Sequence, residues 1–269
     1  MQLLSDKKWV NSHLNLLGYQ VFRYIFAKIL SFIKRRRTSD LDVISLRKNG
    51  YLIKNDFLEA DQFKDLQNCF TDKVFSQLGS DNSFEDNDTV VIRKSIQMTE
   101  LEGSTQIEHG IKSIFDFTTK VLRLPDNYRR EITLWFDKII AKKGRSSQNE
   151  IHTDTYHNAY KVWYFPLGVK SDQTPLVYYS RSHKISFRRA LFEYQKSLTA
   201  NPGDELSWRL NSSQINFFAT QECMTKIICK PNTLLIVNVH GFHHRDISDT
   251  ETQRAQFHFS IPRIPSDGL

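Results

Sequence analysis

Two side chains that commonly bind metals, His152 and Asp154, stand two residues apart in the segment 150–154. On an extended strand, residues i and i+2 project from the same face, so this spacing would direct an imidazole and a carboxylate to one side. One distant histidine would complete a set of two imidazoles and one carboxylate. That facial set holds ferrous iron and leaves coordination positions open for a chelating co-substrate and O₂. The sequence therefore predicts two ligands of a mononuclear iron centre.

The third ligand has three candidates, His240, His243 and His244, about ninety residues downstream. Alternation along a strand would put His240 and His244 on one face and His243 on the other, so the pattern alone leaves the choice open. Arg254 follows on what is predicted to be the next strand. Its guanidinium could bind the far carboxylate of 2-oxoglutarate through a forked contact that lysine cannot reproduce.

In combination, these residues resemble the phytanoyl-CoA dioxygenase family of iron(II)- and 2-oxoglutarate-dependent oxygenases. The family pattern is His-x-Asp, a distal His, ten residues and an Arg, which here corresponds to His152, Asp154, His243 and Arg254. The resemblance favours His243 as the distal ligand, because it follows Gly-Phe and has the family's spacing to the arginine. His244 remains the alternative ligand, with only nine intervening residues.

Three weaker pieces of the sequence resemble the same family in the same order. Residues 46–58 are similar to its opening Gly-Tyr-hydrophobic strand and the start of the following helix. Residues 180–184 resemble its Gly-Ser-His-Lys turn, with Arg181 close to the usual glycine position, and there His183 is expected to stabilise the turn. Residues 238–243 resemble the strand end that delivers the distal ligand. The resemblance covers roughly 45–263.

Further pocket residues are predicted from their positions on strands. His258 and Ser260 fall on the strand face of Arg254 and could contact the co-substrate, although His258 could equally be a core histidine. For the substrate we expect contacts from His157, from Trp163 and from Arg188. Of Trp163 and its neighbour Tyr164, one is expected to be core. Arg188 belongs to the segment 187–220, which interrupts the strands and is expected to form a rim or lid.

The resemblance implies oxidative decarboxylation of 2-oxoglutarate to succinate and CO₂, coupled to oxidation of a substrate C–H bond with Fe²⁺ as cofactor and O₂ as oxidant. Asp154 favours hydroxylation, because related halogenases lack this carboxylate so that a halide can take its place. The substrate class stays open between a small molecule and a lipid- or glycan-linked molecule. Two alternatives are a non-catalytic binding module recruited by the N-terminal helix and an isomerase-type metal barrel, which would have no need of Arg254.

Helices come first and strands later in this chain, which favours one mainly-β catalytic domain over 38–269, a double-stranded β-helix (jelly roll) with flanking helices. Helices are predicted over 43–49, with a stop at Gly50, and over 59–75 and 107–122, and a surface loop over 78–88. Strands are predicted over 51–53, 131–141, 150–154, 160–168, 176–179, 225–229, 233–238 and 254–262.

The net charge of +7 is concentrated at the N-terminus. Residues 1–37 hold eight basic residues and one acidic residue, a net +7 that equals the charge of the whole chain. The remainder is therefore neutral overall, which argues against nucleic acid as a partner. The three cysteines, Cys69, Cys223 and Cys229, lack metal-motif spacing and are typical of reduced thiols in a cytoplasmic protein.

Residues 11–37 are predicted to form a basic amphipathic helix with a wide apolar sector and a narrow stripe that includes Gln20 and Arg23. Arg23 and Lys28 interrupt the apolar run, so a membrane-spanning helix is not expected. Two alternatives remain. The helix could lie on an anionic membrane surface with the basic run 34–37 at the headgroups. It could instead pack on its own domain or on a second subunit of a homo-oligomer.

Overall fold

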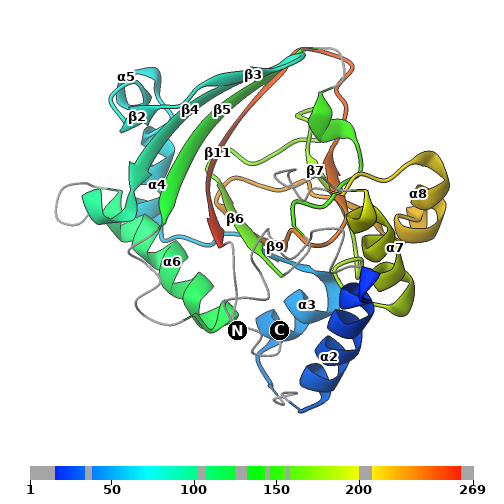
Figure 1. The fold of residues 1–269 in the computed structure, drawn as a ribbon. Coiled ribbons are helices and arrows are strands. Elements are labelled where there is room, and N and C mark those ends of the chain that lie inside the picture. The colour runs from blue at the N-terminus through cyan, green and yellow to red at the C-terminus, as the bar shows by residue number, and fades with distance from the viewer. Residues whose placement is uncertain are drawn as a thin grey trace.

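The computed structural model describes residues 16–33, 38–101, 107–124, 132–142, 146–155, 158–199 and 208–261. In this part of the chain, an antiparallel sheet of eight strands packs against a second sheet of three strands, with helices on the outside (Figure 1). The architecture is that of a jelly roll, and the prediction of a mainly-β domain with flanking helices is confirmed.

The large sheet has the strand order β1-β9-β6-β11-β5-β4-β2, with β3 also paired to β4. Its strands are β1 (Tyr51–Lys54), β2 (Ser80–Asp81), β3 (Phe84–Asp86), β4 (Thr89–Gln97), β5 (Thr133–Ala141), β6 (Tyr160–Phe165), β9 (Thr233–Asn238) and β11 (Thr252–Ile261). The small sheet has the order β10-β7-β8 and consists of β7 (Leu176–Tyr179), β8 (Met224–Lys226) and β10 (His243–Arg245).

Strand β9 shows how the large sheet is covered on both faces. All six of its residues are buried. Leu234 and Ile236 belong to the core cluster on the helix side, whereas Leu235 and Val237 pack with Tyr178 of the small sheet. A strand covered on both sides is expected to be apolar throughout, as this one is. On the strands β6 and β11, polar residues line a cavity between the two sheets. They are Lys161, Arg254, Gln256 and His258.

The outer face of the large sheet is covered by helices. These are α3 (Leu41–Asn49), α4 (Ala60–Asn68), the single turn α5 (Asp72–Phe75) and α6 (Glu108–Leu122). Phe115 of α6 contacts Phe259 of β11, with ring centroids 5.7 Å apart. Helix α3 begins at the cap Asp40, whose carboxylate accepts the Asp42 amide, and ends at Gly50, which has a left-handed φ of 88°. The predicted stop at Gly50 is thus confirmed.

Several predicted element boundaries are wrong. The helix over 59–75 is divided into α4 and α5, because the chain turns at 69–71. Strand β4 was not predicted, and the loop over 78–88 contains the short strands β2 and β3 that pair with it. Residues 150–154 form no strand of either sheet, and their two isolated bridges both involve His152, which pairs with Arg209 and with His243.

Helix α2 (Tyr19–Ile33) packs against α7 (Phe187–Leu198), and α8 (Ser212–Phe218) follows α7 in the chain (Figure 1). Within the predicted helix 11–37, residues 19–33 are helical, and 11–15 and the basic run 34–37 lie outside the described residues. No helix in the described ranges is long and apolar enough to cross a membrane.

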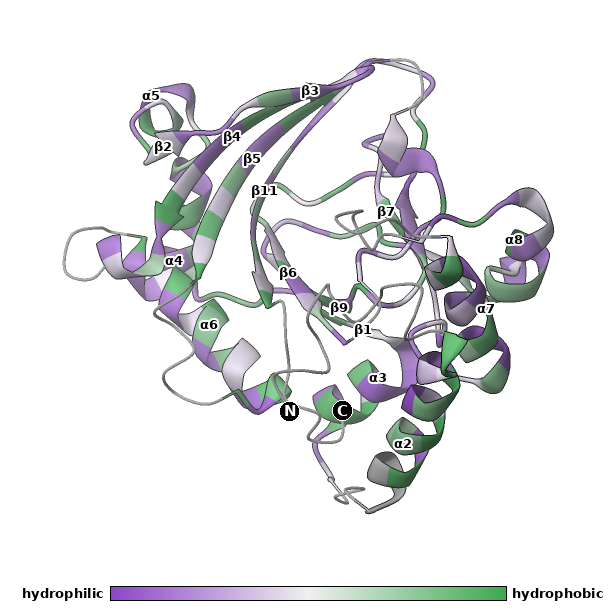
Figure 2. Ribbon diagram, viewed as in Figure 1, coloured by the Kyte–Doolittle hydropathy of each residue, from purple (hydrophilic) through white to green (hydrophobic). Residues whose placement is uncertain are grey.

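The inward side of α2 is its polar stripe. Gln20 is fully buried, and Arg23 forms an ion pair with the buried Glu193 of α7. The apolar sector points outward instead, and Figure 2 shows the largely hydrophobic colouring of this helix. Helix α2 therefore contacts its own domain through the polar stripe, because the buried carboxylate of Glu193 pairs with Arg23, and the alternatives of a membrane or a second subunit for the apolar sector remain predictions.

Glu193 is the centre of a buried ionic cluster. Besides Arg23, it accepts hydrogen bonds from Arg189 Nε (2.8 Å) and His240 Nε2 (2.7 Å). Arg189 also donates to the His240 carbonyl (3.0 Å), and its guanidinium lies 3.8 Å from the ring centroid of Phe242. The cluster thus ties α7 to the segment 240–242, directly before His243.

We predict that Arg189→Gln lowers the free energy of unfolding by about 3 kcal/mol or more, because one partner of a buried ion pair is removed. Arg188→Gln, on the exposed side of the same helix, is the matched control and should cost less than about 0.5 kcal/mol. Urea denaturation of both variants measures the difference. Equal midpoints for the two variants would show that the cluster does not stabilise the fold.

Candidate metal centre

Two reciprocal backbone hydrogen bonds bring His152 and His243 together. The His152 amide donates to the His243 carbonyl, and the His243 amide donates to the His152 carbonyl, each at 2.9 Å. Residues that exchange both bonds in this way lie directly opposite each other, and their side chains share one face. The two imidazole centroids are 4.7 Å apart. His152 and His243, which are 91 residues apart in the sequence, are thus neighbours in space.

Asp154 lies on the same side although 150–154 is not part of a sheet. Its amide donates to the Val239 carbonyl at 3.0 Å, and the Thr153 amide donates to the Trp208 carbonyl at 3.1 Å, so the segment is held extended from both sides. Asp154 Oδ1 is 3.4 Å from Nε2 of His152 and 3.4 Å from Nε2 of His243. The predicted same-face arrangement of His152 and Asp154 is therefore present.

Backbone carbonyls orient both imidazoles. Nδ1 of His152 is 2.6 Å from the Glu150 carbonyl oxygen, and Nδ1 of His243 is 2.9 Å from the Gly241 carbonyl oxygen. A carbonyl only accepts, so each Nδ1 carries the proton and each Nε2 presents a free lone pair. Histidines that bind metals are usually held by such a bond from the other ring nitrogen.

The electrostatics of the site also fit a cation. One ligand atom from each of His152, Asp154 and His243 lies within 4.8 Å of the others. Burial lowers the pKa of His152, which favours the neutral imidazole that a metal needs. Burial alone would raise the pKa of Asp154, but the Lys161 ammonium, 2.6 Å from Oδ2, holds it well below its usual range. Asp154 is therefore ionised, and Oδ1 is turned toward the two histidines.

The other two candidate histidines face elsewhere. His244 stacks on Tyr179, with ring centroids 5.8 Å apart, and burial lowers its pKa to about 4. His240 is bonded to Glu193 in the ionic cluster. Of the three candidates, His243 is the one that joins His152 and Asp154.

The three side chains lie in a cavity of about 260 Å³ between the two sheets. Arg254, Gln256 and His258, alternate residues of β11, line one wall together with Trp163 of β6. The Arg254 guanidinium donates from Nη1 to the Thr174 carbonyl, and its Nε is buried without a hydrogen-bond partner among the described residues. Burial and the neighbouring Arg245 lower the pKa of Arg254 to about 9, so it remains charged at neutral pH.

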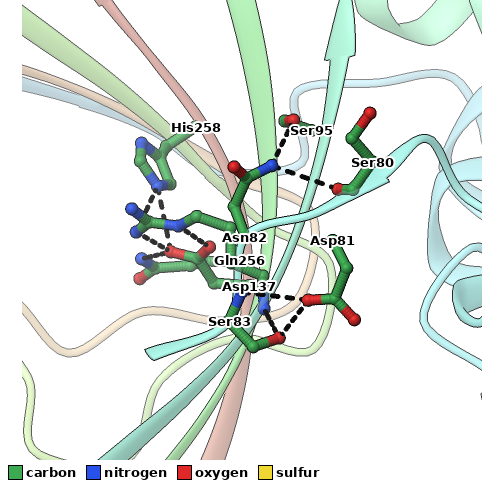
Figure 3. Close-up of polar contacts among 9 residues, drawn as sticks. Ser80, Asp81, Asn82, Ser83, Ser95, Asp137, Gln256 and His258 are labelled. Carbon is green, nitrogen blue, oxygen red and sulfur yellow. Dashed lines mark hydrogen bonds and ion pairs between the residues drawn. The ribbon is translucent and has the colours of Figure 1, made fainter. Parts of the chain in front are cut away.

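A polar row across three strands supports this wall (Figure 3). Arg93, Asp137 and Gln256 stand opposite one another on β4, β5 and β11. The Asp137 carboxylate accepts from Arg93 Nε (2.7 Å), from Gln256 Nε2 (3.0 Å) and from His258 Nε2 (2.9 Å). His258 is therefore a pocket residue fixed by a buried carboxylate, and its Nδ1 is buried without a partner in the described structure.

The remaining predicted site residues are placed as follows. Tyr164 belongs to the core and Trp163 lines the cavity, so one of these two neighbouring aromatic residues is core, as expected. Ser260 shares the strand face of His258 but is not among the lining residues. Arg188 is exposed on α7, over the ring of Phe217, and the described part of 187–220 contributes no lining residue. His157 lies outside the described residues.

The 180–184 turn has the expected form. Arg181, close to the family's glycine position, has a left-handed φ of 70°, and His183 Nε2 donates to the Arg47 carbonyl at 3.2 Å. Sequence reasoning missed three basic residues of the cavity, Arg93, Lys161 and Arg245. Two of them could have been found from strand alternation, because residues two positions apart project from the same face. Lys161 stands two residues before Trp163, and Arg245 stands two residues after His243.

No family model matches this sequence, and no curated protein matches it. Solved structures do match the fold. HygX from Streptomyces hygroscopicus, solved with nickel, 2-oxoglutarate and hygromycin B, is 9% identical with a TM-score of 0.51, and the match covers 84% of this chain and 87% of HygX. SnoK, a non-heme alpha ketoglutarate dependent carbocyclase from nogalamycin biosynthesis, is 11% identical with a TM-score of 0.52 and 84% of both chains covered.

AviO1 from Streptomyces viridochromogenes Tue57 is 10% identical, with a TM-score of 0.51, and the match covers 86% of this chain and 100% of AviO1. At these identities the likeness concerns the fold. The chain therefore shares the jelly-roll architecture of these proteins.

We predict that His243→Ala weakens binding of a divalent metal by more than about 100-fold, because loss of a ligand exceeds the 10- to 100-fold cost of losing a ligand's supporting hydrogen bond. His244→Ala removes the adjacent histidine, which faces away, and should leave metal affinity unchanged. Titration with Co²⁺ compares the variants. The reverse ranking would identify His244 as the ligand.

Proposed function

We propose that this protein is an Fe(II)- and 2-oxoglutarate-dependent dioxygenase that hydroxylates a C–H bond, with His152, Asp154 and His243 as the iron ligands. The observation that carries the proposal is the convergence of His152 Nε2, Asp154 Oδ1 and His243 Nε2 in one cavity with Arg254. Two histidines and one carboxylate are the set expected for non-heme iron, and a buried arginine suits a co-substrate carboxylate.

Bound iron would couple decarboxylation of 2-oxoglutarate to insertion of one oxygen atom from O₂ into the substrate, giving succinate, CO₂ and an alcohol. The protein's own residues prepare the site for that reaction. Lys161 holds Asp154 ionised and engages Oδ2, which leaves Oδ1 for the metal. Arg254 offers a fork that includes its unpartnered Nε to the far carboxylate of 2-oxoglutarate. Phe165 and Leu176 line the cavity with apolar surface that excludes water.

Within this class, the His152, Asp154, His243 and Arg254 pattern supports a phytanoyl-CoA dioxygenase-like enzyme. Asp154 supports hydroxylation over halogenation because the carboxylate is retained. Fold neighbours have other outcomes, since SnoK is a carbocyclase and SnoN, solved with Fe³⁺, alpha ketoglutarate and nogalamycin RO, is an epimerase. HygX and SnoN were solved with the complex molecules hygromycin B and nogalamycin RO, which supports a small-molecule or glycan-linked substrate.

We predict that Arg254→Lys weakens 2-oxoglutarate binding by about 10- to 100-fold, because lysine keeps the charge but loses the fork, a contact worth roughly 1.5–3 kcal/mol. Affinity for the metal should not change. Calorimetric titration of the metal-loaded protein measures both. Equal 2-oxoglutarate affinity in the wild type and the variant would favour a metal barrel that uses no 2-oxoglutarate.

We also propose that α2 contacts an anionic membrane surface and brings the catalytic domain to a membrane-proximal substrate. Phe22, Ile25, Phe26 and Ile29 recur at helical spacing on the outward face of α2, with 38% to 59% of each side chain exposed. Basic residues flank this face. Burial and the charges of Arg181, Lys48 and Lys28 lower the pKa of Lys184, so these four exposed cations occupy one region. Apolar surface beside basic side chains suits anionic lipid.

We predict that the full-length protein sediments with vesicles that contain anionic lipid, that salt weakens this binding, and that Ile25→Asp abolishes it. Leu167→Asp, at an exposed apolar position outside α2, is the matched control and should bind like the wild type. Unchanged binding of Ile25→Asp would contradict the proposal. Loss of a homodimer in Ile25→Asp without any vesicle binding would assign the face to a second copy of the chain.

A further inference from the structure

Arg245 stands beside the metal ligands without an assigned role. It lies on β10 two residues after His243, so both side chains leave the same face of the strand about 6.6 Å apart along the backbone. Its side chain lines the cavity that contains His152 and Asp154. The Arg245 guanidinium therefore shares a cavity with the three residues that would hold the metal.

The small sheet places Arg245 between the metal ligand His243 and Arg254. His243 is paired with Tyr178 of β7, and Arg245 is paired with Leu176. The Arg254 guanidinium is bonded to the carbonyl of Thr174, a further two residues along the same segment. The order along this wall is the metal ligand, then Arg245, then Arg254.

The two arginines differ from the other cations of the cavity in their pairing. Arg93 forms an ion pair with Asp137, and Lys161 forms one with Asp154. Among the described residues, no ion pair within 4.0 Å involves Arg245 or Arg254, and Arg245 Nη1 and Arg254 Nε are buried without hydrogen-bond partners. The charges of Asp86 and Asp137 act on Arg245 from beyond ion-pair distance, and Asp86 accepts a hydrogen bond from Ser147 Oγ at 3.0 Å.

Two positively charged guanidiniums in one cavity, each with an N–H donor that has no partner among the described residues, favour the binding of an anion. A buried donor without a partner costs free energy, and so does the repulsion between two like charges that no direct ion pair offsets. An anion bound between the guanidiniums would satisfy both. A co-substrate that extends from the metal toward Arg254 would have to pass Arg245.

We infer that Arg245 and Arg254 together bind the far carboxylate of 2-oxoglutarate, so that the co-substrate site has two arginines. The inference rests on the proposed function. Two guanidiniums around one carboxylate make the second negative charge of the co-substrate a strict requirement. The site should therefore discriminate strongly against 2-oxo acids that have only one carboxylate, such as 2-oxobutyrate.

The test measures binding by calorimetry, without turnover, in the full-length protein loaded with Mn²⁺ and kept free of oxygen. The ligands are 2-oxoglutarate and 2-oxobutyrate. The variants are Arg245→Gln, Arg245→Lys and Arg254→Gln, and His244→Gln on the opposite face of β10 is the matched control. Metal affinity and thermal unfolding of each variant report whether the site is intact.

Arg245→Gln should weaken 2-oxoglutarate binding by about tenfold or more, the loss expected for one charge-assisted contact, with little change in metal affinity. Arg245→Lys should lose less, because it keeps the charge. The preference for 2-oxoglutarate over 2-oxobutyrate should shrink in Arg245→Gln and stay at the wild-type value in His244→Gln.

A wild-type-like 2-oxoglutarate affinity in Arg245→Gln, beside a loss in Arg254→Gln, would overturn the role of Arg245 and leave the proposed function standing. Absence of 2-oxoglutarate binding by the metal-loaded wild type would overturn both.

Discussion

The paired backbone hydrogen bonds between His152 and His243 are the constraint on which the candidate metal centre depends. They join a segment outside both sheets to the first residue of β10, and they fix two imidazoles side by side with their Nδ1 protons directed to backbone carbonyls. A ligand pair held by main-chain bonds is independent of the flexibility of long side chains. The site is therefore organised by the fold itself, and a metal ion would not have to assemble it.

The segment that delivers His243 is in turn held from two sides. Gly241 lies against Tyr178, and a Cβ atom at this position would come within 1.9 Å of the tyrosine oxygen, so a larger residue does not fit. On the other side, the Arg189 and Glu193 pair of α7 holds His240. Because Arg23 of α2 binds the same Glu193, contacts of the N-terminal helix are continuous with the support of the distal ligand.

The sequence was sufficient for the parts of the site that depend on residue type and short spacing. His152 and Asp154 are recognisable because few residue types bind metals and the two stand two residues apart, whereas His243 was favoured over His244 by the family resemblance and its spacing to Arg254. Successive residues of a strand point to alternate faces, and this alternation correctly predicted that Arg254 and His258 share one face of the regular strand β11. The same rule succeeded for His152 and Asp154 for a different reason, since long-range backbone bonds keep their segment extended without a sheet.

What the sequence did not reveal depends on long-range pairing. Asp137 reads as an ordinary polar residue of a strand, and its role appears only when β4 and β11 place Arg93 and Gln256 on either side of it. Glu193 likewise resembles a solvated helix residue until Arg23, Arg189 and His240 surround it. That unforeseen carboxylate holds the polar stripe of α2 against α7 through Arg23. The predicted substrate contacts of Arg188 and of the described part of 187–220 have no counterpart in the cavity between the sheets.

The central claim is that one cavity holds iron(II) through His152, Asp154 and His243 and receives 2-oxoglutarate against Arg254. Visible absorption during an oxygen-free titration tests both parts together, because a 2-oxo acid that chelates iron(II) produces a charge-transfer band that neither component has alone. If the proposed ligands and co-substrate are right, the wild type gives a saturable band at one 2-oxoglutarate per iron and Asp154→Ala gives no band. A wild-type protein that binds iron and 2-oxoglutarate without such a band, or an Asp154→Ala variant that keeps it, would contradict the account.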